Sequence, residues 1–155
     1  MSLQRGWFLE DATPGSVIRH PGGRTIGADE HPRLAWLTDN ASDVHGDAHR
    51  AAAGPFGQPL VLGALTAAVV IGLAEPATSL PWQAGRATPS GWPSIALTGL
   101  VVAGDTIVAT SLVGAVTVDD DGRGGLVRRV IEGRNQRGEV VARVVDERWA
   151  PSRHG

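Results

Sequence analysis

PLVLGALTAAVVIGLA, residues 59–74, contains the element around which we expect this chain to fold. From Leu62 to Leu73 the sequence predicts a helix that is apolar on every side. Such a helix has to be wrapped by other structure rather than lie on a surface. The apolar run is also shorter than the ~20 residues needed to cross a bilayer, so it predicts a buried helix and no membrane span.

The second half of the chain carries the sequence pattern of β-strands. The predicted strands are Trp92–Leu100, the β-branched run Thr106–Val118, and a hairpin of Leu126–Asn135 and Glu139–Trp149 that turns at residues 135–138. Consecutive strands with little helix between them favour an antiparallel sheet. With the apolar helix, they predict an α+β domain in which the sheet wraps around that helix.

The first half is expected to hold short extended pieces and two further helices. They are extended segments over 17–20 and 24–26, a helix over 28–38, and a short helix over 48–53 with Asp47 as its N-cap. In the helix over 28–38, Leu34, Trp36 and Leu37 lie near one face. His31 in that helix and His49 in the next are expected to face solvent.

Length and composition restrict the function classes. At 155 residues the chain fits one domain over 1–155, with a core from about residue 15 to residue 149. The chain has no lysine, which excludes a Schiff base, and no cysteine, which excludes a thiolate nucleophile, a disulfide and a Cys-ligated metal. Its five tryptophans are not interleaved with basic residues, which disfavours nucleic-acid binding. No secretory leader is recognisable, so we expect a cytoplasmic protein.

Residues 39–47, DNASDVHGD, concentrate the polar groups that could carry chemistry. His45 is a candidate proton carrier, with Asp39, Asn40 and Asp43 as polar neighbours. Gly63 stands at the start of the apolar helix, where backbone N–H groups have no intrahelical acceptor and can stabilise an oxyanion. The five histidines are scattered without metal-ligand spacing, so no metal is expected.

Each of these residues also has a structural interpretation that the sequence leaves open. His45 could be a packed core histidine, and Gly63 could simply permit a close approach of a strand to the helix. Asn40 could be a helix C-cap, since Asn tolerates the left-handed conformation. Asp39 and Asp43 could be solvated turn residues.

Five motifs, in order, resemble the MaoC-like dehydratase family, which has the hotdog fold. They are GRTIGADEHPRLAWLTDN (23–40), DVHGDAHRAA (43–52), GQPLVLGALTAAVVIGLA (57–74), VVAGDTI (101–107) and NQRGEVV (135–141). The resemblance covers most of the chain. It implies a single hotdog domain, with an antiparallel sheet wrapped around a central helix.

The resemblance also implies a site. In the family, a carboxylate and a histidine hold water, and the N–H of a glycine polarises a thioester carbonyl. By position the histidine is His45, the glycine is Gly63, and the carboxylate is replaced by Asn40, an amide that can orient water but cannot take a proton at neutral pH. Leu62 replaces a second family histidine, and Ala68 stands where several hydratases carry serine.

The implied activity is reversible hydration or dehydration at the Cα–Cβ bond of an acyl thioester. The substrate would carry CoA or an acyl carrier protein phosphopantetheine, with no metal or redox cofactor. His45 would move the proton alone, or with Asp39 or with Asp43, which replaces a family proline. The resemblance further implies a homodimer or higher homo-oligomer. Two alternatives remain: a non-catalytic acyl-CoA-binding subunit that pairs with an active homologue, and a thioesterase with Asp43 as its carboxylate.

Overall fold

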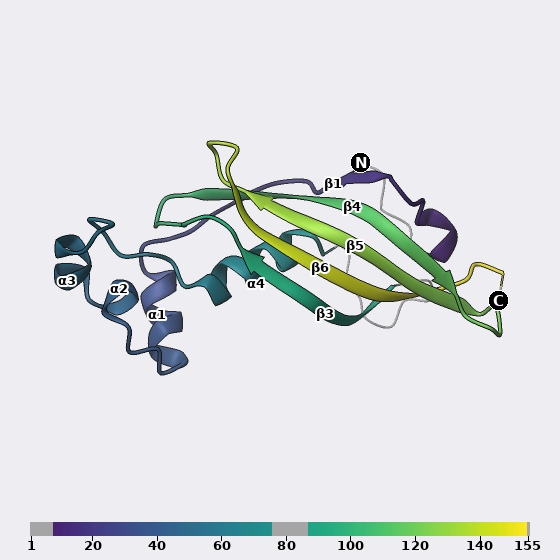
Figure 1. Cartoon of the computed structure of the whole chain (residues 1–155), viewed down its shortest axis with the longest axis horizontal. Coiled ribbons are helices and arrows are strands. Elements are labelled where there is room, and N and C mark those ends of the chain that lie inside the picture. The colour runs from purple at the N-terminus through teal and green to yellow at the C-terminus, as the bar shows by residue number, and fades with distance from the viewer. Residues whose placement is uncertain (1–7, 76–86, 155) are drawn as a thin grey trace.

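The fold is an antiparallel sheet wrapped around one long helix, as the sequence predicts. In the computed structural model, which describes residues 8–75 and 87–154, the strands run in the order β1-β4-β5-β6-β3, with β2 also paired to β4. Their bounds are β1 Val17–Arg19, β2 Arg24–Thr25, β3 Thr88–Leu97, β4 Thr106–Val118, β5 Gly124–Arg134 and β6 Val140–Pro151. Figure 1 shows the long strands crossing in front of helix α4. The predicted hairpin is the pair β5–β6.

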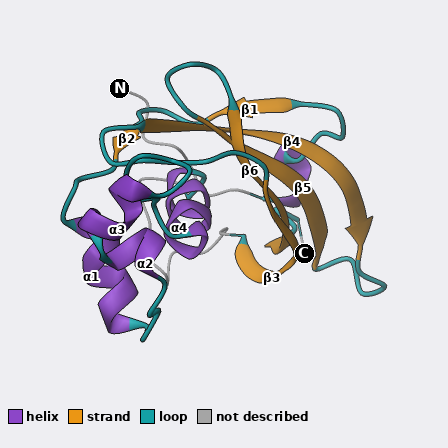
Figure 2. Cartoon of the chain, turned by 60° about the vertical axis from the view of Figure 1, so that its left-hand side comes forward, coloured by secondary structure: helices purple, strands orange, loops and turns teal. Residues whose placement is uncertain are grey.

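The helices fall into two groups. The buried helix α4 spans Gly63–Leu73, and the shorter α1 (Glu30–Leu37), α2 (Asp43–Gly46) and α3 (Ala48–Ala53) gather beside one end of it (Figure 2). A 3-10 turn, η1, covers Leu9–Asp11. The single-turn helix α2 was not predicted. Asp47 is the N-cap of α3, because its side chain accepts the Arg50 N–H at 2.9 Å. No helix in the described ranges has the length and apolarity to span a membrane.

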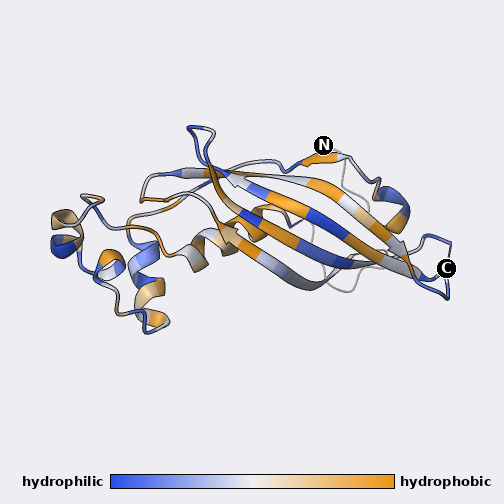
Figure 3. Cartoon of the chain, in the orientation of Figure 1, coloured by the Kyte–Doolittle hydropathy of each residue, from blue (hydrophilic) through white to orange (hydrophobic). Residues whose placement is uncertain are grey.

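The sheet buries one face against α4. Apolar and polar residues alternate along β5 and β6 (Figure 3), as period-two side-chain alternation requires. Val70 of α4 is fully buried and lies against Gly133 of β5, where any Cβ would overlap its methyl group. Because Gly133 has no side chain, the helix and the sheet approach closely.

Helix α1 presents a different face to the protein than its sequence predicts. His31 is only 3% exposed and Ala35 is buried beside it, whereas Trp36 is 81% and Leu37 is 76% exposed. The prediction that His31 faces solvent is therefore wrong, while His49 is exposed as expected. Residues four apart share a helix face, so burying His31 and Ala35 turns Trp36 and Leu37 outward.

Two of the family-like motifs meet at Asp105. Its Oδ1 accepts hydrogen bonds from Gln136 at 2.7 Å and Arg137 at 2.9 Å, and its Oδ2 accepts the Val102 N–H at 3.1 Å. The carboxylate thereby joins the turn before β4 to the β5–β6 turn. These motifs therefore maintain the fold at a place outside the site described below.

The far end of α4 is fastened by a buried ionic cluster, consisting of Glu75, Arg129, Asp146 and Arg148. One oxygen of Asp146 accepts hydrogen bonds from Nε of Arg129 and of Arg148, each at 2.7 Å. Arg148 also forms an ion pair with Glu75, and Arg129 donates to the Ala74 carbonyl at 3.5 Å. The Ala74 carbonyl, at the C-terminal end of α4, is therefore bound to β5, and the neighbouring Glu75 is bound to β6.

His20 lies beside this cluster. Its Nε2 is 2.7 Å from the hydroxyl of the buried Ser111. Burial, and then the nearby Arg129 and Arg148 charges, lower the pKa of His20 to about 4. The ring is therefore neutral at neutral pH.

Candidate active site

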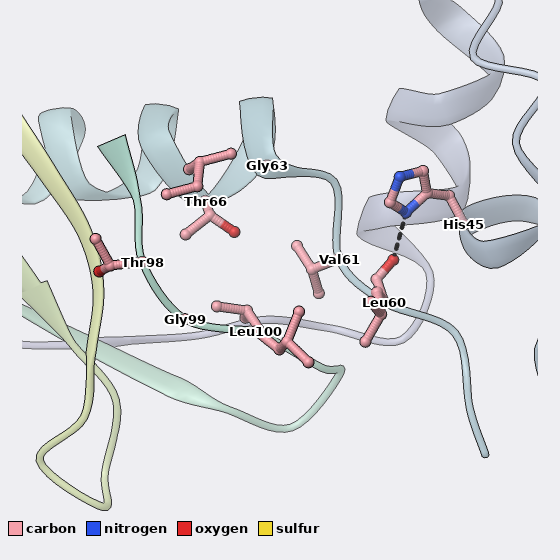
Figure 4. A pocket seen from close by; sticks show the side chains of 10 residues that line it. His45, Leu60, Val61, Gly63, Thr66, Thr98, Gly99 and Leu100 are labelled. Carbon is pink, nitrogen blue, oxygen red and sulfur yellow. Dashed lines mark hydrogen bonds between the residues drawn. The ribbon is translucent and has the colours of Figure 1, made fainter. Parts of the chain in front are cut away.

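A pocket of ≈ 370 Å³ opens at the N-terminal end of α4. Figure 4 shows His45 on one side, the start of α4 above, and the segment after β3 below. The lining consists of His45, Leu60, Val61, Gly63, Thr66 and residues 97–101. The lining is mostly apolar with a few polar groups, which is the usual character of a small-molecule site.

His45 is held in one tautomer. Its Nδ1 lies 2.8 Å from the Leu60 carbonyl oxygen. A carbonyl can only accept, so Nδ1 carries the proton and Nε2 is the basic atom. The Leu60 N–H in turn donates to the Val44 carbonyl at 2.9 Å. Leu60 therefore fastens both the ring of His45 and the short helix that carries it.

Gly63 lines the same pocket as the first residue of α4. Its N–H has no acceptor within the helix, and the positive end of the helix dipole adds to its attraction for negative charge. A Cβ at this position would overlap Cδ1 of Leu97. Both interpretations of this glycine are therefore compatible with the structure, because it packs closely against Leu97 and also presents a helix N-terminus.

Thr66 is a polar pocket residue that our sequence analysis did not single out. It is buried, and Figure 4 shows it on α4 near Gly63. Its hydroxyl donates to the Leu62 carbonyl at 3.3 Å. Thr66 follows Gly63 by three residues, and residues at this spacing share one face of a helix. This spacing could have identified Thr66 from the sequence. Ala68, at the family's serine position, is exposed and does not line the pocket.

The other candidates from residues 39–47 do not line the pocket. Asn40 is exposed, and its side-chain oxygen accepts the Ser42 N–H at 3.1 Å, which forms a turn into α2. The left-handed residue after α1 is Asp39, with φ 51°, and not Asn40 as the C-cap interpretation predicts. Asp43 is exposed and forms a salt bridge with Arg50 at 2.6 Å. Within the described ranges no group of three or more His, Asp or Glu side chains could hold a metal ion.

Solved structures with the same fold are dehydratases and hydratases, among others. The chain is 26% identical to a MaoC-like dehydratase from Rhodospirillum rubrum, with a TM-score of 0.81 over 96% of this chain and 99% of that one. It is 24% identical to an (R)-hydratase from A. caviae involved in PHA biosynthesis, with a TM-score of 0.66 over 88% and 95% of the two chains. No protein-family model matches the sequence, and no curated protein matches it either.

One similar structure is a complex of two different chains. It is the ChsH1–ChsH2 complex from Mycobacterium tuberculosis, 22% identical, with a TM-score of 0.64 over 89% of this chain and 98% of that one. At such identity the likeness extends to the fold alone. The fold itself thus occurs both in hydratases and in a two-chain complex.

Proposed function

By its fold the chain is a MaoC-like hotdog protein, and from this premise we propose that it hydrates or dehydrates an acyl thioester at the Cα–Cβ bond. The single observation that carries the proposal is that His45 and Gly63 line one pocket. This pairs a proton carrier with a helix N-terminus, the two parts that such a reaction needs. The substrate carries CoA or the phosphopantetheine of an acyl carrier protein.

His45 moves the proton in this proposal. During hydration, Nε2 accepts a proton from the water whose oxygen bonds to Cβ, and the imidazolium then delivers that proton to Cα. The Leu60 carbonyl supports this role, because its bond to Nδ1 leaves Nε2 with a free lone pair. Asp43 is already paired with Arg50, which favours a single group acting first as base and then as acid.

The Gly63 N–H stabilises the oxygen of the thioester. Negative charge develops on this oxygen when water attacks Cβ, and a preset donor at a helix N-terminus is complementary to it. Thr66, one turn further along α4, supplies a hydroxyl to the same pocket. The expected water-orienting role of Asn40 is not part of this scheme, because Asn40 does not line the pocket; its bond to Ser42 sets the start of the helix that carries His45.

The test is turnover of enoyl thioesters by the purified protein. Crotonyl-CoA and mesaconyl-CoA, followed by a broader acyl-CoA panel, are monitored by loss of enoyl absorbance. We expect His45→Ala to lower the rate by about 10²- to 10⁴-fold. His49→Ala, an exposed histidine on α3, is the matched control and keeps the rate. Absence of turnover on the whole panel, or full activity of His45→Ala, would rule out the proposal.

The edge strand β3 supports a further part of the proposal, a homodimer with the site near its interface. Ile95 and Leu97 of β3 are 47% and 54% exposed, and Leu100, just after the strand, is 56% exposed. Residues 97–101 also line the pocket. An exposed apolar edge strand favours pairing with another strand. Sedimentation should give a dimer for the wild type and a monomer for Ile95→Lys. A monomeric wild-type chain would contradict the dimer.

A second candidate function is a non-catalytic subunit that pairs with an active homologue through the same edge. The amide at Asn40, in the place of the family's acid, favours it. An inactive wild type that co-purifies with a second, active hotdog chain would support this alternative over the enzyme.

A further inference from the structure

Thr66 carries the only hydrogen-bonding side chain of α4, whose sequence is GALTAAVVIGL. It is 3% exposed and lines the pocket together with His45 and Gly63. In Figure 4 its side chain extends from α4 into the pocket, close to the start of the helix at Gly63. A buried hydroxyl costs free energy unless it is hydrogen-bonded, and threonine has a lower helix propensity than alanine or leucine. Packing and helix formation therefore do not explain why this position is a threonine.

The hydrogen bond that the Thr66 hydroxyl makes inside the protein is a weak one. Oγ1 lies 3.3 Å from the Leu62 carbonyl oxygen, whereas bonds between a hydroxyl and an oxygen are usually about 2.5–3.0 Å long. The same kind of bond at the end of α1, from Thr38 to the Leu34 carbonyl, is 2.7 Å long. The Leu62 carbonyl also accepts the Thr66 N–H at 3.0 Å, so it stays hydrogen-bonded when the hydroxyl turns away. The Thr66 hydroxyl can therefore rotate and donate its proton to a ligand in the pocket.

We propose that the Thr66 hydroxyl donates a second hydrogen bond to the thioester oxygen that the Gly63 N–H binds. This inference rests on the proposed function. Side chains of a helix tilt toward its N-terminus, so the Thr66 side chain leans over the turn that begins at Gly63. Gly63 contributes no side chain that would separate its own N–H from the hydroxyl. The two donors therefore face one volume at the start of α4.

A donor role suits this hydroxyl better than that of a nucleophile. A hydroxyl acts as a nucleophile only when a neighbouring base takes its proton, and the partner of Thr66 in the structure is a carbonyl. The wall beside the two donors is apolar, because Leu97 packs against Gly63. A hydrogen bond to a developing negative charge is stronger in such surroundings than in water. The location of Thr66 thus favours stabilisation of the thioester oxygen.

The test compares Thr66→Val, which keeps the branched shape and removes the hydroxyl, with Thr66→Ser, which keeps the hydroxyl. We expect Thr66→Val to lower kcat for crotonyl-CoA on the order of 10²-fold. KM should change little, because the bond strengthens as negative charge develops on the oxygen. Thr66→Ser should keep most of the wild-type kcat. Thr38→Val removes the same kind of bond outside the pocket and is the control, which keeps both constants.

A readout independent of turnover is the C=O stretching frequency of bound butyryl-CoA, labelled with ¹³C at the thioester carbonyl and measured by infrared difference spectroscopy. Butyryl-CoA is saturated, so it binds without being hydrated. A hydrogen bond to the carbonyl oxygen weakens the C=O bond and lowers this frequency. We expect Thr66→Val to raise the frequency toward that of free butyryl-CoA, and Thr66→Ser to retain the wild-type value.

The outcomes separate this inference from the proposed function. An unchanged frequency or an unchanged kcat in Thr66→Val would overturn the second hydrogen bond, and so would equal losses in Thr66→Val and Thr66→Ser, which would assign the effect to packing. Thr66→Ala replaces Thr66→Val if the latter does not fold. A wild type that binds butyryl-CoA without turning over enoyl thioesters would refute the proposed function, and the infrared comparison would still decide the role of Thr66. A wild type that binds no butyryl-CoA would overturn both.

Discussion

The two ends of α4 treat polar groups in opposite ways. At the N-terminal end, Gly63 faces a mostly apolar pocket shared with His45, and the first N–H groups of the helix have no acceptor within it. At the C-terminal end, the buried ionic cluster pairs its charges with one another and with Ala74. One end of the helix therefore has N–H groups without an acceptor in the helix, whereas at the other end the charges are paired, although Oδ1 of Asp146 has no hydrogen-bond partner among the described residues. Polar groups at the N-terminal end are therefore available to a ligand, whereas those at the C-terminal end stabilise the fold.

The largest effect should come from breaking the cluster at Asp146. Asp146→Asn removes the carboxylate that Nε of Arg129 and Nε of Arg148 both contact, so the buried cluster loses one negative charge. We expect a loss of about 3–5 kcal/mol in unfolding free energy, measured by urea denaturation. Activity per folded molecule should stay unchanged.

The control for Asp146 is an exposed salt bridge. Asp121→Asn breaks the pair with Arg123 and should cost less than about 1 kcal/mol. If the two substitutions have similar effects, the buried cluster is not what fastens the far end of α4.

A smaller loss is expected where α4 crosses the sheet. Gly133→Ala would place a methyl group against the side chain of Val70, which is fully buried and β-branched. Overpacking of this kind costs about 1–3 kcal/mol, measured by urea denaturation. Combining it with Val70→Ala should recover part of the loss. A double variant no more stable than Gly133→Ala would show that the strain arises elsewhere.

Acid should weaken the C-terminal end through His20. Its pKa in the folded protein is about 4 and its ordinary value is 6.5, so the unfolded chain binds more protons between these pH values. Stability should therefore fall as pH drops from about 6.5 to about 4, by about 1–2 kcal/mol, because solvent screens part of the interaction of this half-buried ring. His20→Gln should flatten this slope. An unchanged slope in His20→Gln would assign the acid sensitivity to other groups.

The smallest effect on stability is expected at the N-terminal end. In Gly63→Ala the new methyl group meets Cδ1 of Leu97, the flexible tip of a half-exposed side chain that can rotate away. The unfolding free energy should change by less than about 1 kcal/mol, because a half-exposed side chain can change its rotamer at little cost in free energy. Turnover should fall by about 10-fold because the pocket narrows, and Leu97→Ala should restore it. Full turnover in Gly63→Ala would mean that this part of the pocket holds no substrate.

The sequence predicted the sheet and the central helix because both depend on local periodicity. The strand over 106–118 has the predicted bounds, and α4 begins one residue after the predicted start. His45 and Gly63 could be paired in advance because both lie in motifs that resemble one family. These features are encoded within short segments of the chain.

The sequence could not predict features that depend on contacts between distant segments. The ionic cluster joins Glu75 to residues of β5 and β6 that lie more than fifty positions away. The burial of His31 depends on which face of α1 meets α2, and the conspicuous apolar pair Trp36 and Leu37 suggested the opposite face. The distance of Asn40 from the pocket likewise follows from the turn that its own side chain forms.

The two hydrogen bonds of Leu60 have a consequence for how this protein can be re-engineered. They connect α2 to a residue only three positions before Gly63, so proton carrier and helix start are linked through Val61 and Leu62. The exposed loop over 54–58 lies outside that link. This loop should therefore tolerate inserted residues. One residue added between Leu60 and Gly63, in contrast, would displace Gly63 relative to His45.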